Sequence, residues 1–434
     1  MDKENNRYTI KSIKGALPAT GRKDRDGRKM NYKIPVLIIL TVIYLFKMLK
    51  NLARSRSAGR AVPANVADVY DPETYGKWKA YHAEKNRLNY IKDTADYAIG
   101  MILMAFDLYA AFAKLFPPDL FMQMMAVVLL SELASLLTLP AAWYDTMVIE
   151  EKYGFNRSRA GTFWADQVKE LIIGLCITIG IGAMLMGVHQ SMGDWMIPVF
   201  AAVMTVFMLA FSFLYPFFSK IFNKFTPLEE GELKEKLTAL LEKHGYQVRA
   251  IQVMDASKRS TKSNAYFSGF GKTKTIVLYD TLVQAMTPDE ICAVFAHEMG
   301  HGLHKDVLKR QVLSFGQMLV LGILAWLTLR TAGIFTDFGF TEINYGFALI
   351  LIMEVEFALI SPLFGLVMNA ISRRNEYRAD AQAVEEGYGE ELISGLKKLA
   401  KGNFADLSPD PWLVKLDYSH PTLSQRIDAI RKKS

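Results

Sequence analysis

Long runs of apolar residues, separated by polar connections, dominate the pattern of this chain. A helix that crosses a bilayer needs about 20 predominantly apolar residues. Seven runs approach or exceed that length, and they lie at residues 34–49, 95–116, 120–144, 171–192, 195–219, 308–332 and 343–370. We therefore predict a mainly α-helical, polytopic membrane protein with seven transmembrane helices, of which the first is the shortest.

The composition supports a membrane location. Of the 434 residues, 51% are hydrophobic and 22% are charged, whereas soluble domains average about 45–50% apolar and about 25% charged. The net charge of +7 suits an anionic partner, and with so much apolar sequence lipid headgroups are favoured over nucleic acid. Cys176 and Cys292 show no metal-ligand spacing, which excludes a disulfide framework and a cysteine zinc site.

The loop charges predict the orientation in the membrane. One group of segments shares a side and carries nearly all loop cations, namely residues 50–93, 150–170, 220–307 and the tail from 373. The connections near 117–119, 193–194 and 333–342 carry essentially none. By the positive-inside rule the first group faces the cytoplasm, in a bacterial or archaeal plasma membrane or a eukaryotic endoplasmic reticulum. The basic tail 1–33, predicted to be mobile, is then an exception on the opposite side.

Residues 220–307 predict a small α/β unit between the fifth and sixth apolar runs. An amphipathic helix is expected at 228–244, and β-like runs follow at 247–254, 264–267 and 273–279. A further helix should begin after Thr287, a plausible N-cap with Pro288 at the first helical position and Glu290 three residues on. The predicted division is thus 1–33, 34–219, 220–307, 308–372 and 373–434, with the last part completing the α/β domain.

This last helix contains the pattern H-E-x-x-H at His297, Glu298 and His301. Residues four apart lie on one helical face, so both imidazoles can bind one zinc ion while Glu298 polarises a water beside it. A catalytic zinc ion needs a third protein ligand. Glu376 is the candidate, and Asp380, four residues on, would accept the free ring N–H of a ligand histidine. The alternative is two solvated acids on a charged helix.

Near the C-terminus, His420 precedes an amphipathic helix that carries Arg426. A peptide hydrolase needs donors aimed at the oxyanion of the tetrahedral intermediate, and these two side chains are candidates. From spacing alone, an ordinary helix-start loop with a surface arginine is equally consistent. His304, three residues after His301, is either a competing ligand or a residue of the helix face.

Together these residues resemble the CAAX prenyl proteases of the Ste24 type, which are integral-membrane zinc metallopeptidases of the M48 class. The resemblance covers roughly residues 60 to 432. It rests on the segments Ile149–Asn156, Ser263–Phe267, Ile276–Leu282, the H-E-x-x-H pattern, Asn375–Asp380 and Ser419–Leu423. The shorter M48 membrane proteases of the HtpX type have fewer spans, so the seven apolar runs favour the Ste24 type.

The resemblance implies a ring of seven helices around a water-filled chamber, capped by a zincin-like domain. It implies one zinc ion per chain, held by His297, His301 and Glu376. The other implied roles are Glu298 as general base and acid, Asp380 as partner of a ligand, His420 and Arg426 as transition-state donors, and Asn264 and Tyr266 as substrate-binding residues.

Three functions remain open at this point. The first is cleavage of prenylated C-terminal peptides, and the second is broad-specificity quality control of membrane or misfolded chains with the same zinc site. The third is a transporter or lipid-binding protein whose polar path would be lined by intramembrane acids. These acids are Asp107, Glu132, Glu354 and Glu356.

Overall fold

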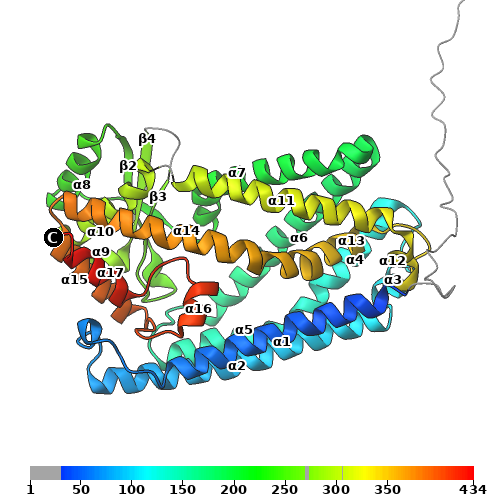
Figure 1. Cartoon of the computed structure of the whole chain (residues 1–434), viewed down its shortest axis with the longest axis horizontal. Coiled ribbons are helices and arrows are strands. Elements are labelled where there is room, and N and C mark those ends of the chain that lie inside the picture. The colour runs from blue at the N-terminus through cyan, green and yellow to red at the C-terminus, as the bar shows by residue number, and fades with distance from the viewer. Residues whose placement is uncertain (1–30, 269–272, 305) are drawn as a thin grey trace, which may run out of the picture.

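The computed structural model describes residues 31–268, 273–304 and 306–434. The predicted basic tail at 1–33 therefore falls almost entirely outside the described residues. The described chain forms an elongated bundle of helices with an α/β region at one end (Figure 1). The C-terminus lies at that α/β end, and the beginning of α1 lies at the opposite end of the bundle.

The bundle is built from the N-terminal and central helices of the chain. The N-terminal helices are α1 (Lys33–Ser57), η1 (Ala64–Val66), α2 (Pro72–Ala105), α3 (Leu108–Ala113), α4 (Leu120–Ser135), η2 (Leu136–Thr138), α5 (Leu139–Tyr144) and the π-helix η3 (Asp145–Glu150). The central helices are α6 (Ala160–Met192), η4 (Gly193–Trp195), α7 (Met196–Phe222), α11 (Asp306–Arg330), α12 (Ala332–Asp337), α13 (Tyr345–Ile350), the π-helix η6 (Leu351–Phe357) and α14 (Ala358–Glu385).

Five helical stretches of the described chain are long and apolar enough to cross a membrane. They are Lys33–Ser57, Leu120–Glu150, Ala160–Ala210, Leu308–Arg330 and Tyr345–Glu385. The third stretch holds two helices, α6 and α7, which pack against each other on either side of η4. The run predicted at 95–116 is divided between α2 and α3, because the chain turns at Asp107 with a φ of 56°.

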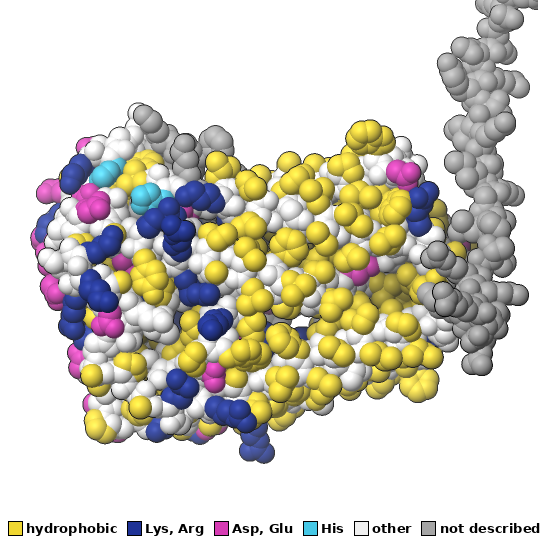
Figure 2. All heavy atoms as spheres, viewed as in Figure 1, with side chains coloured by type: hydrophobic (Ala, Val, Ile, Leu, Met, Phe, Trp, Pro, Cys, Tyr) yellow, Lys and Arg dark blue, Asp and Glu magenta, His cyan; other side chains and the backbone are white. Residues whose placement is uncertain are grey.

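The surface of the bundle matches a lipid environment. Apolar side chains cover the helices, whereas charged side chains gather at the α/β end (Figure 2). On α1, exposed apolar residues recur at helical spacing, each with 53–57% of its surface accessible: Ile34, Ile38, Val42, Leu45 and Leu49. Exposure of such an apolar stripe to water is unfavourable, whereas contact with lipid acyl chains is not, so this surface suits a membrane.

The α/β end contains a four-stranded sheet in the order β1-β2-β4-β3. Its strands are β1 (Phe225–Pro227), β2 (Gln247–Met254), β3 (Ala265–Ser268) and β4 (Thr273–Tyr279). Strands β2 and β4 run parallel, and β1 and β3 are antiparallel to their neighbours. The predicted strands at 247–254 and 273–279 are confirmed, and the one at 264–267 is shifted by one residue.

The helix predicted at 228–244 is too long. It forms only as α8 (Glu232–Lys243), because the residues before it join the sheet. Strand β1 pairs with β2, and the backbone N–H of Leu228 still donates to the carbonyl of Ile251 at 2.9 Å. Pairing with the sheet therefore keeps the chain extended up to Leu228, and the extended Gly231 N-cap delays the helix to Glu232.

Helix α10 (Pro288–Leu303) is the central element of the α/β end. It begins with the predicted capping box, in which Thr287 accepts from the Glu290 N–H and Glu290 accepts from the Thr287 N–H. Its apolar face packs in a core shared with the sheet, α8 and α9 (Asp280–Ala285). The C-terminal helices complete this end, namely α15 (Gly389–Gly402), α16 (Pro411–Leu416) and α17 (Leu423–Arg431).

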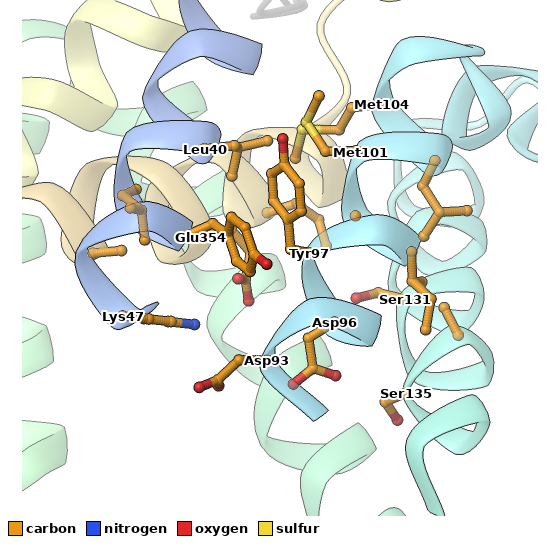
Figure 3. A pocket seen from close by; sticks show the side chains of 18 of the residues that line it. Leu40, Lys47, Asp93, Asp96, Tyr97, Met101, Met104, Ser131, Ser135 and Glu354 are labelled. Atoms are coloured by element: carbon orange, nitrogen blue, oxygen red, sulfur yellow. The ribbon is translucent and has the colours of Figure 1, made fainter. Parts of the chain in front are cut away.

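A cavity of about 390 Å³ lies inside the bundle, between α1, α2, α4 and η6. Its lining mixes apolar side chains with charged ones, including Lys47, Asp93, Asp96 and Glu354 (Figure 3). Tyr97 extends across the cavity between α1 and α2. Lys47 and Asp96 are themselves exposed, so the cavity has a polar, accessible side and the bundle is not filled by an apolar core throughout.

Candidate metal centre

The two histidines of the H-E-x-x-H pattern lie on α10 and face Glu376 of α14. The Nε2 atom of His297 is 3.4 Å from Oε2 of Glu376, and Nε2 of His301 is 3.2 Å from Oε1 of Glu376. The three ligand atoms all lie within 4.8 Å of one another. The structure thus brings together the three residues that the sequence nominated, from segments about 80 positions apart.

A glycine permits this close approach of α10 and α14. A Cβ atom at Gly300, the residue before His301, would lie 2.9 Å from the Cα of Ala379 and 3.1 Å from the Cβ of Gln382. These distances leave no room for a side chain. Gly300 therefore allows the helices to pack closely enough for one carboxylate to reach both imidazoles.

The geometry and chemistry of this group fit a zinc ion. Ligands at about 2.0–2.1 Å from a tetrahedral ion lie roughly 3.3 Å from one another, close to the two nitrogen–oxygen distances above. The Oε2 atom of Glu376 is also buried without a hydrogen-bond partner. A buried, unsatisfied carboxylate oxygen is costly, and a bound cation would remove that cost. Two imidazoles and one carboxylate are a common catalytic zinc set.

His297 is oriented by a buried pair of charges. Its Nδ1 atom is 2.9 Å from Oδ1 of Asp380, so the ring N–H donates to the carboxylate and Nε2 is left for the ion. Arg426 of α17 donates to the same carboxylate twice, from Nε at 3.0 Å and from Nη2 at 2.6 Å. The bidentate contact with Arg426 thereby fixes Asp380 against His297.

His301 has a matching partner that the sequence analysis missed. Its Nδ1 atom is 3.2 Å from Oδ2 of Asp306 at the start of α11, and Arg378 of α14 donates to Oδ1 of Asp306 at 2.8 Å. Asp306 is 2% exposed, which is unusual for an acid without a structural task. The sequence signal was weak: an acid shortly after the second histidine and an arginine two residues after Glu376.

These acids make the centre attractive to a cation. Burial lowers the pKa of His297, and so does Arg426, but the interactions with the carboxylates of Asp380 and Glu376 together outweigh both and raise its pKa above the usual range. Burial also lowers the pKa of His301, but the interactions with Glu376 and Asp306 together outweigh burial and raise its pKa above the usual range. A site whose field favours protonated histidines favours a metal cation at the same position.

The remaining predicted catalytic residues lie around this group. Glu298 follows His297 on α10 and is partly buried. Within the described residues its carboxylate forms no hydrogen bond or ion pair. His420 is at the rim, with 60% of its side chain exposed and Nε2 3.4 Å from Oε1 of Glu376. The Nη1 atom of Arg426 is 3.6 Å from Oε2 of Glu376, while its other two nitrogens bind Asp380.

The predicted substrate-binding residues lie on the edge strand rather than at the metal group. Asn264 is exposed just before β3, and its carbonyl accepts from the N–H of Tyr279 on β4 at 3.1 Å. Tyr266 packs against Met254 and Val277, so its side chain contributes to the sheet. His304 is the C-cap of α10 and is not among the three clustered ligands.

Two family models together cover almost the whole chain. The N-terminal domain of CAAX prenyl proteases, described as having five membrane helices, matches residues 37–224. Peptidase family M48 matches residues 227–434, which contain all three clustered ligands. The chain belongs to peptidase family M48. It is a membrane metallopeptidase related to CAAX prenyl protease 1, as the sequence predicted.

Known proteins of the same group agree. The chain is 32% identical to CAAX prenyl protease 1 of Saccharomyces cerevisiae over 401 residues, which are 85% of this chain and 88% of the yeast protein. It is 27% identical to the human homologue, with coverage of 91% and 94%. The crystal structure of Ste24p from S. mikatae superposes with a TM-score of 0.86 at 28% identity, covering 93% of this chain and 100% of that one.

Family membership favours the enzyme over the transporter or lipid-binding alternative, and the intramembrane acids do not decide between them. Asp107 forms an ion pair with Lys33 at 2.6 Å, and Glu356 accepts from Thr328. Of the four acids considered, Glu354 lines the described cavity (Figure 3). The other three acids are not among the residues that line this cavity.

Proposed function

We propose that this M48 peptidase is a zinc endopeptidase with one ion per chain, held by His297, His301 and Glu376. The observation that carries the proposal is the buried, unpartnered Oε2 atom of Glu376, placed opposite the imidazole nitrogens of α10. A zinc ion at this position would polarise the scissile carbonyl and lower the pKa of a water molecule.

The protein side chains would then move the protons. Glu298 carries an unengaged carboxylate beside the ligands, so it would accept a proton from the attacking water and pass it to the leaving amine. His420, at the open rim, would donate a hydrogen bond to the oxyanion. Arg426 has two nitrogens bound to Asp380, so we assign it mainly to holding Asp380, with Nη1 left to interact near the reacting group.

We propose that the substrate binds as an extended peptide along β3. Within the described residues this strand pairs on one side only, with β4. The carbonyl of Asn264 faces β4, so by strand alternation the backbone groups of Ala265 and Phe267 face the open edge. Strand addition at such an edge reads the peptide backbone rather than its side chains. Asn264 would contact that backbone, and Tyr266 would contribute through its main chain.

Prenylated C-terminal peptides are the proposed substrates, because the relatives are CAAX prenyl proteases. The alternative is quality control with broad specificity, which the same site would support. Mapping of cleavage sites separates the two, since a single cut near a prenylated C-terminus contrasts with many cuts in unrelated chains. In a prokaryote, where ordinary prenylated substrates are lacking, the second function would be favoured.

We further propose seven membrane spans around a chamber, capped by a zincin-like domain. The N-terminal family domain is described as having five membrane helices, and α11 and α14 provide two more apolar stretches. Division of Ala160–Ala210 into α6 and α7, and a contribution from the C-terminal part of α2 with α3, support this count. The charged cavity between α1, α2 and η6 would be part of the chamber.

The catalytic end is proposed to face the cytoplasm, in contact with anionic lipid headgroups. Support comes from the loop cations, which concentrate on that side. In a Cys176→Ser background, which removes the exposed native thiol, Arg56→Cys and Lys114→Cys place exposed thiols at opposite ends. A membrane-impermeant reagent added to intact cells should label Lys114→Cys but not Arg56→Cys. The reverse result would move the active site across the membrane.

The chemistry itself is tested with Glu298→Gln. This variant keeps the shape of the side chain but removes its base, so zinc content should stay at one per chain while peptide hydrolysis falls about 100-fold or more. Metal analysis and turnover of prenylated and unprenylated forms of one peptide provide the measurement. Loss of zinc in this variant would assign Glu298 to the structure of the site instead of its chemistry.

A further inference from the structure

The segment Ile149–Asn156 stands out in the sequence, yet none of its residues contacts the metal ligands. It begins at the end of the π-helix η3, where Ile149 is 1% exposed. The chain then reverses, because the N–H groups of Phe155 and Asn156 both donate to the carbonyl of Glu150, at 2.8 and 3.0 Å. Gly154 makes the turn possible with a φ of 79°.

After this turn the segment pairs with the chain that leads into β3. The N–H of Arg157 donates to the carbonyl of Arg259 at 2.9 Å, and the N–H of Thr261 donates to the carbonyl of Phe155 at 3.1 Å. Asn156 and Ser260 form an isolated antiparallel bridge between these bonds. The end of a membrane helix is thus joined, by backbone bonds, to residues just before the edge strand.

A cluster of charges reinforces this junction. The ammonium group of Lys262 is 3.1 Å from Oε2 of Glu150 and lies over the ring of Phe155, 4.9 Å from its centroid. Glu150 also accepts from Lys85 at 3.0 Å and from the hydroxyl of Tyr81 at 2.6 Å. The side chain of Glu150 is only 14% exposed, so its interaction with Lys262 is poorly screened by solvent.

The residues between Lys262 and β3 are held at every position. The carbonyl of Lys262 accepts from the hydroxyl of Thr281 at 3.1 Å, and the N–H of Ser263 donates to Oδ1 of Asn403 at 3.2 Å. The carbonyl of Asn264 is paired with β4, as described above. Ala265 follows three residues after Lys262, about 10 Å along an extended chain, so a displacement of Lys262 would pass directly into the edge strand.

We propose that the Glu150–Lys262 ion pair positions β3 for peptide binding by fixing the edge strand to the membrane helices. This inference rests on the proposed function, in which the substrate is added to the open edge of β3. Glu150 and Lys262 are positioning residues, because they touch neither the ion nor the reacting atoms. Breaking the pair should leave the zinc group intact and loosen the strand that aligns the peptide.

The expected kinetic signature is a change in KM without a matching change in kcat. In Glu150→Gln and Lys262→Met, KM for a peptide that the wild type cleaves should rise about five- to tenfold, while kcat and zinc content stay within about twofold. Lys262→Arg, which keeps the charge, should retain the wild-type KM. A pair that served only global stability would lower the active fraction, and hence kcat, with KM unchanged, and that result would overturn the proposal.

The same segment offers a matched control. Lys152 pairs with Glu84, but its side chain is 57% exposed, and surface pairs of this kind contribute little. Lys152→Gln should therefore leave KM and kcat unchanged. An equal rise of KM in this variant would contradict a specific role for Glu150 and Lys262.

Amide hydrogen exchange gives a readout that does not depend on catalysis. Peptides covering residues 262–268 should exchange about tenfold faster in Glu150→Gln than in the wild type, whereas α10 should be unchanged. Should Glu150→Gln fail to fold, Lys262→Met carries the test, since Lys262 is 37% exposed. If the wild type binds zinc but cleaves no peptide, the proposed function fails, and the exchange measurement still decides the positioning role. Unchanged exchange in both variants would refute it.

Discussion

The two histidines of the metal centre are oriented by the same kind of partner in different surroundings. Each donates its Nδ1 hydrogen to an aspartate, and each aspartate is paired with an arginine. On the His297 side, the arginine is Arg426, with 10% of its side chain exposed. On the His301 side it is Arg378, with 37% exposed, and a second cation, Lys309, lies 3.4 Å from Asp306.

The two aspartate–arginine pairs contact the histidines in the same way, but their different burial should give them different contributions to folding stability. Arg378 is more exposed than Arg426, so losing its partner should cost less, and the Asp306 pair is expected mainly to orient His301. Arg426 lies where water does not reach, and a buried charge without its partner is strongly unfavourable. The Asp380 pair should therefore support the folding of the α14–α17 interface as well as the orientation of His297.

The largest loss of zinc and activity is expected on removal of either histidine, and it should be equal for His297 and His301. His297→Ala and His301→Ala each remove one of three ligands, so both variants should lose zinc and at least 1,000-fold in activity. Metal analysis of the purified proteins and peptide turnover test this. Full zinc occupancy in either variant would show that this histidine is not a ligand, and its aspartate would then have no ligand to orient.

The next effect should separate the sides. Asp380→Ala should lower the free energy of unfolding by about 3–5 kcal/mol, because the buried Arg426 loses its bidentate partner. Asp306→Ala should cost about 1 kcal/mol, although both variants should bind zinc about 10- to 100-fold more weakly. Thermal unfolding in detergent and competition with a chelator measure the two quantities.

A double variant serves as the control for that difference. Asp380→Ala combined with Arg426→Met removes both charges and should recover part of the lost stability. Equal destabilisation by Asp380→Ala and Asp306→Ala would mean that burial of the arginine does not matter.

The smallest effect concerns the exposed arginine. Arg378→Gln should change stability by less than about 1 kcal/mol and zinc affinity by about threefold, since Lys309 remains near Asp306 and Arg378 is partly exposed. Arg426→Gln should be far more disruptive. Isothermal titration with zinc and thermal unfolding compare the two variants, and an Arg378→Gln variant as unstable as Arg426→Gln would contradict the assignment.

Local signals made part of this fold predictable. The capping box at Thr287, the H-E-x-x-H spacing and strands β2 and β4 depend on neighbouring residues and were found at the predicted positions. The helix predicted at 228–244 failed at its start, because pairing of β1 with β2 is a long-range interaction. The helical periodicity of residues 228–244 contains no information about this strand pairing.

The same distinction applies to the metal centre. Glu376 and Asp380 were found because their spacing of four residues places both on one helical face. Asp306 and Arg378 were missed because their role depends on how the start of α11 meets α14, which no spacing within either helix encodes. The close contact at Gly300 is likewise visible only once both helices are packed.

The last apolar stretch, Tyr345–Glu385, is helical from the membrane cavity to the metal centre. It carries Glu354, in the π-helix η6, at the cavity and Glu376 at the centre, and the α-helical part from Ala358 to Glu376 spans about 27 Å at 1.5 Å per residue. The helix therefore fixes both the distance of Glu376 from the cavity and the direction in which its side chain points. Insertion of one residue would turn Glu376 by about 100° and point it away from α10. Length changes between the cavity and the α/β end are therefore expected to be tolerated in loops of this chain but not along this helix.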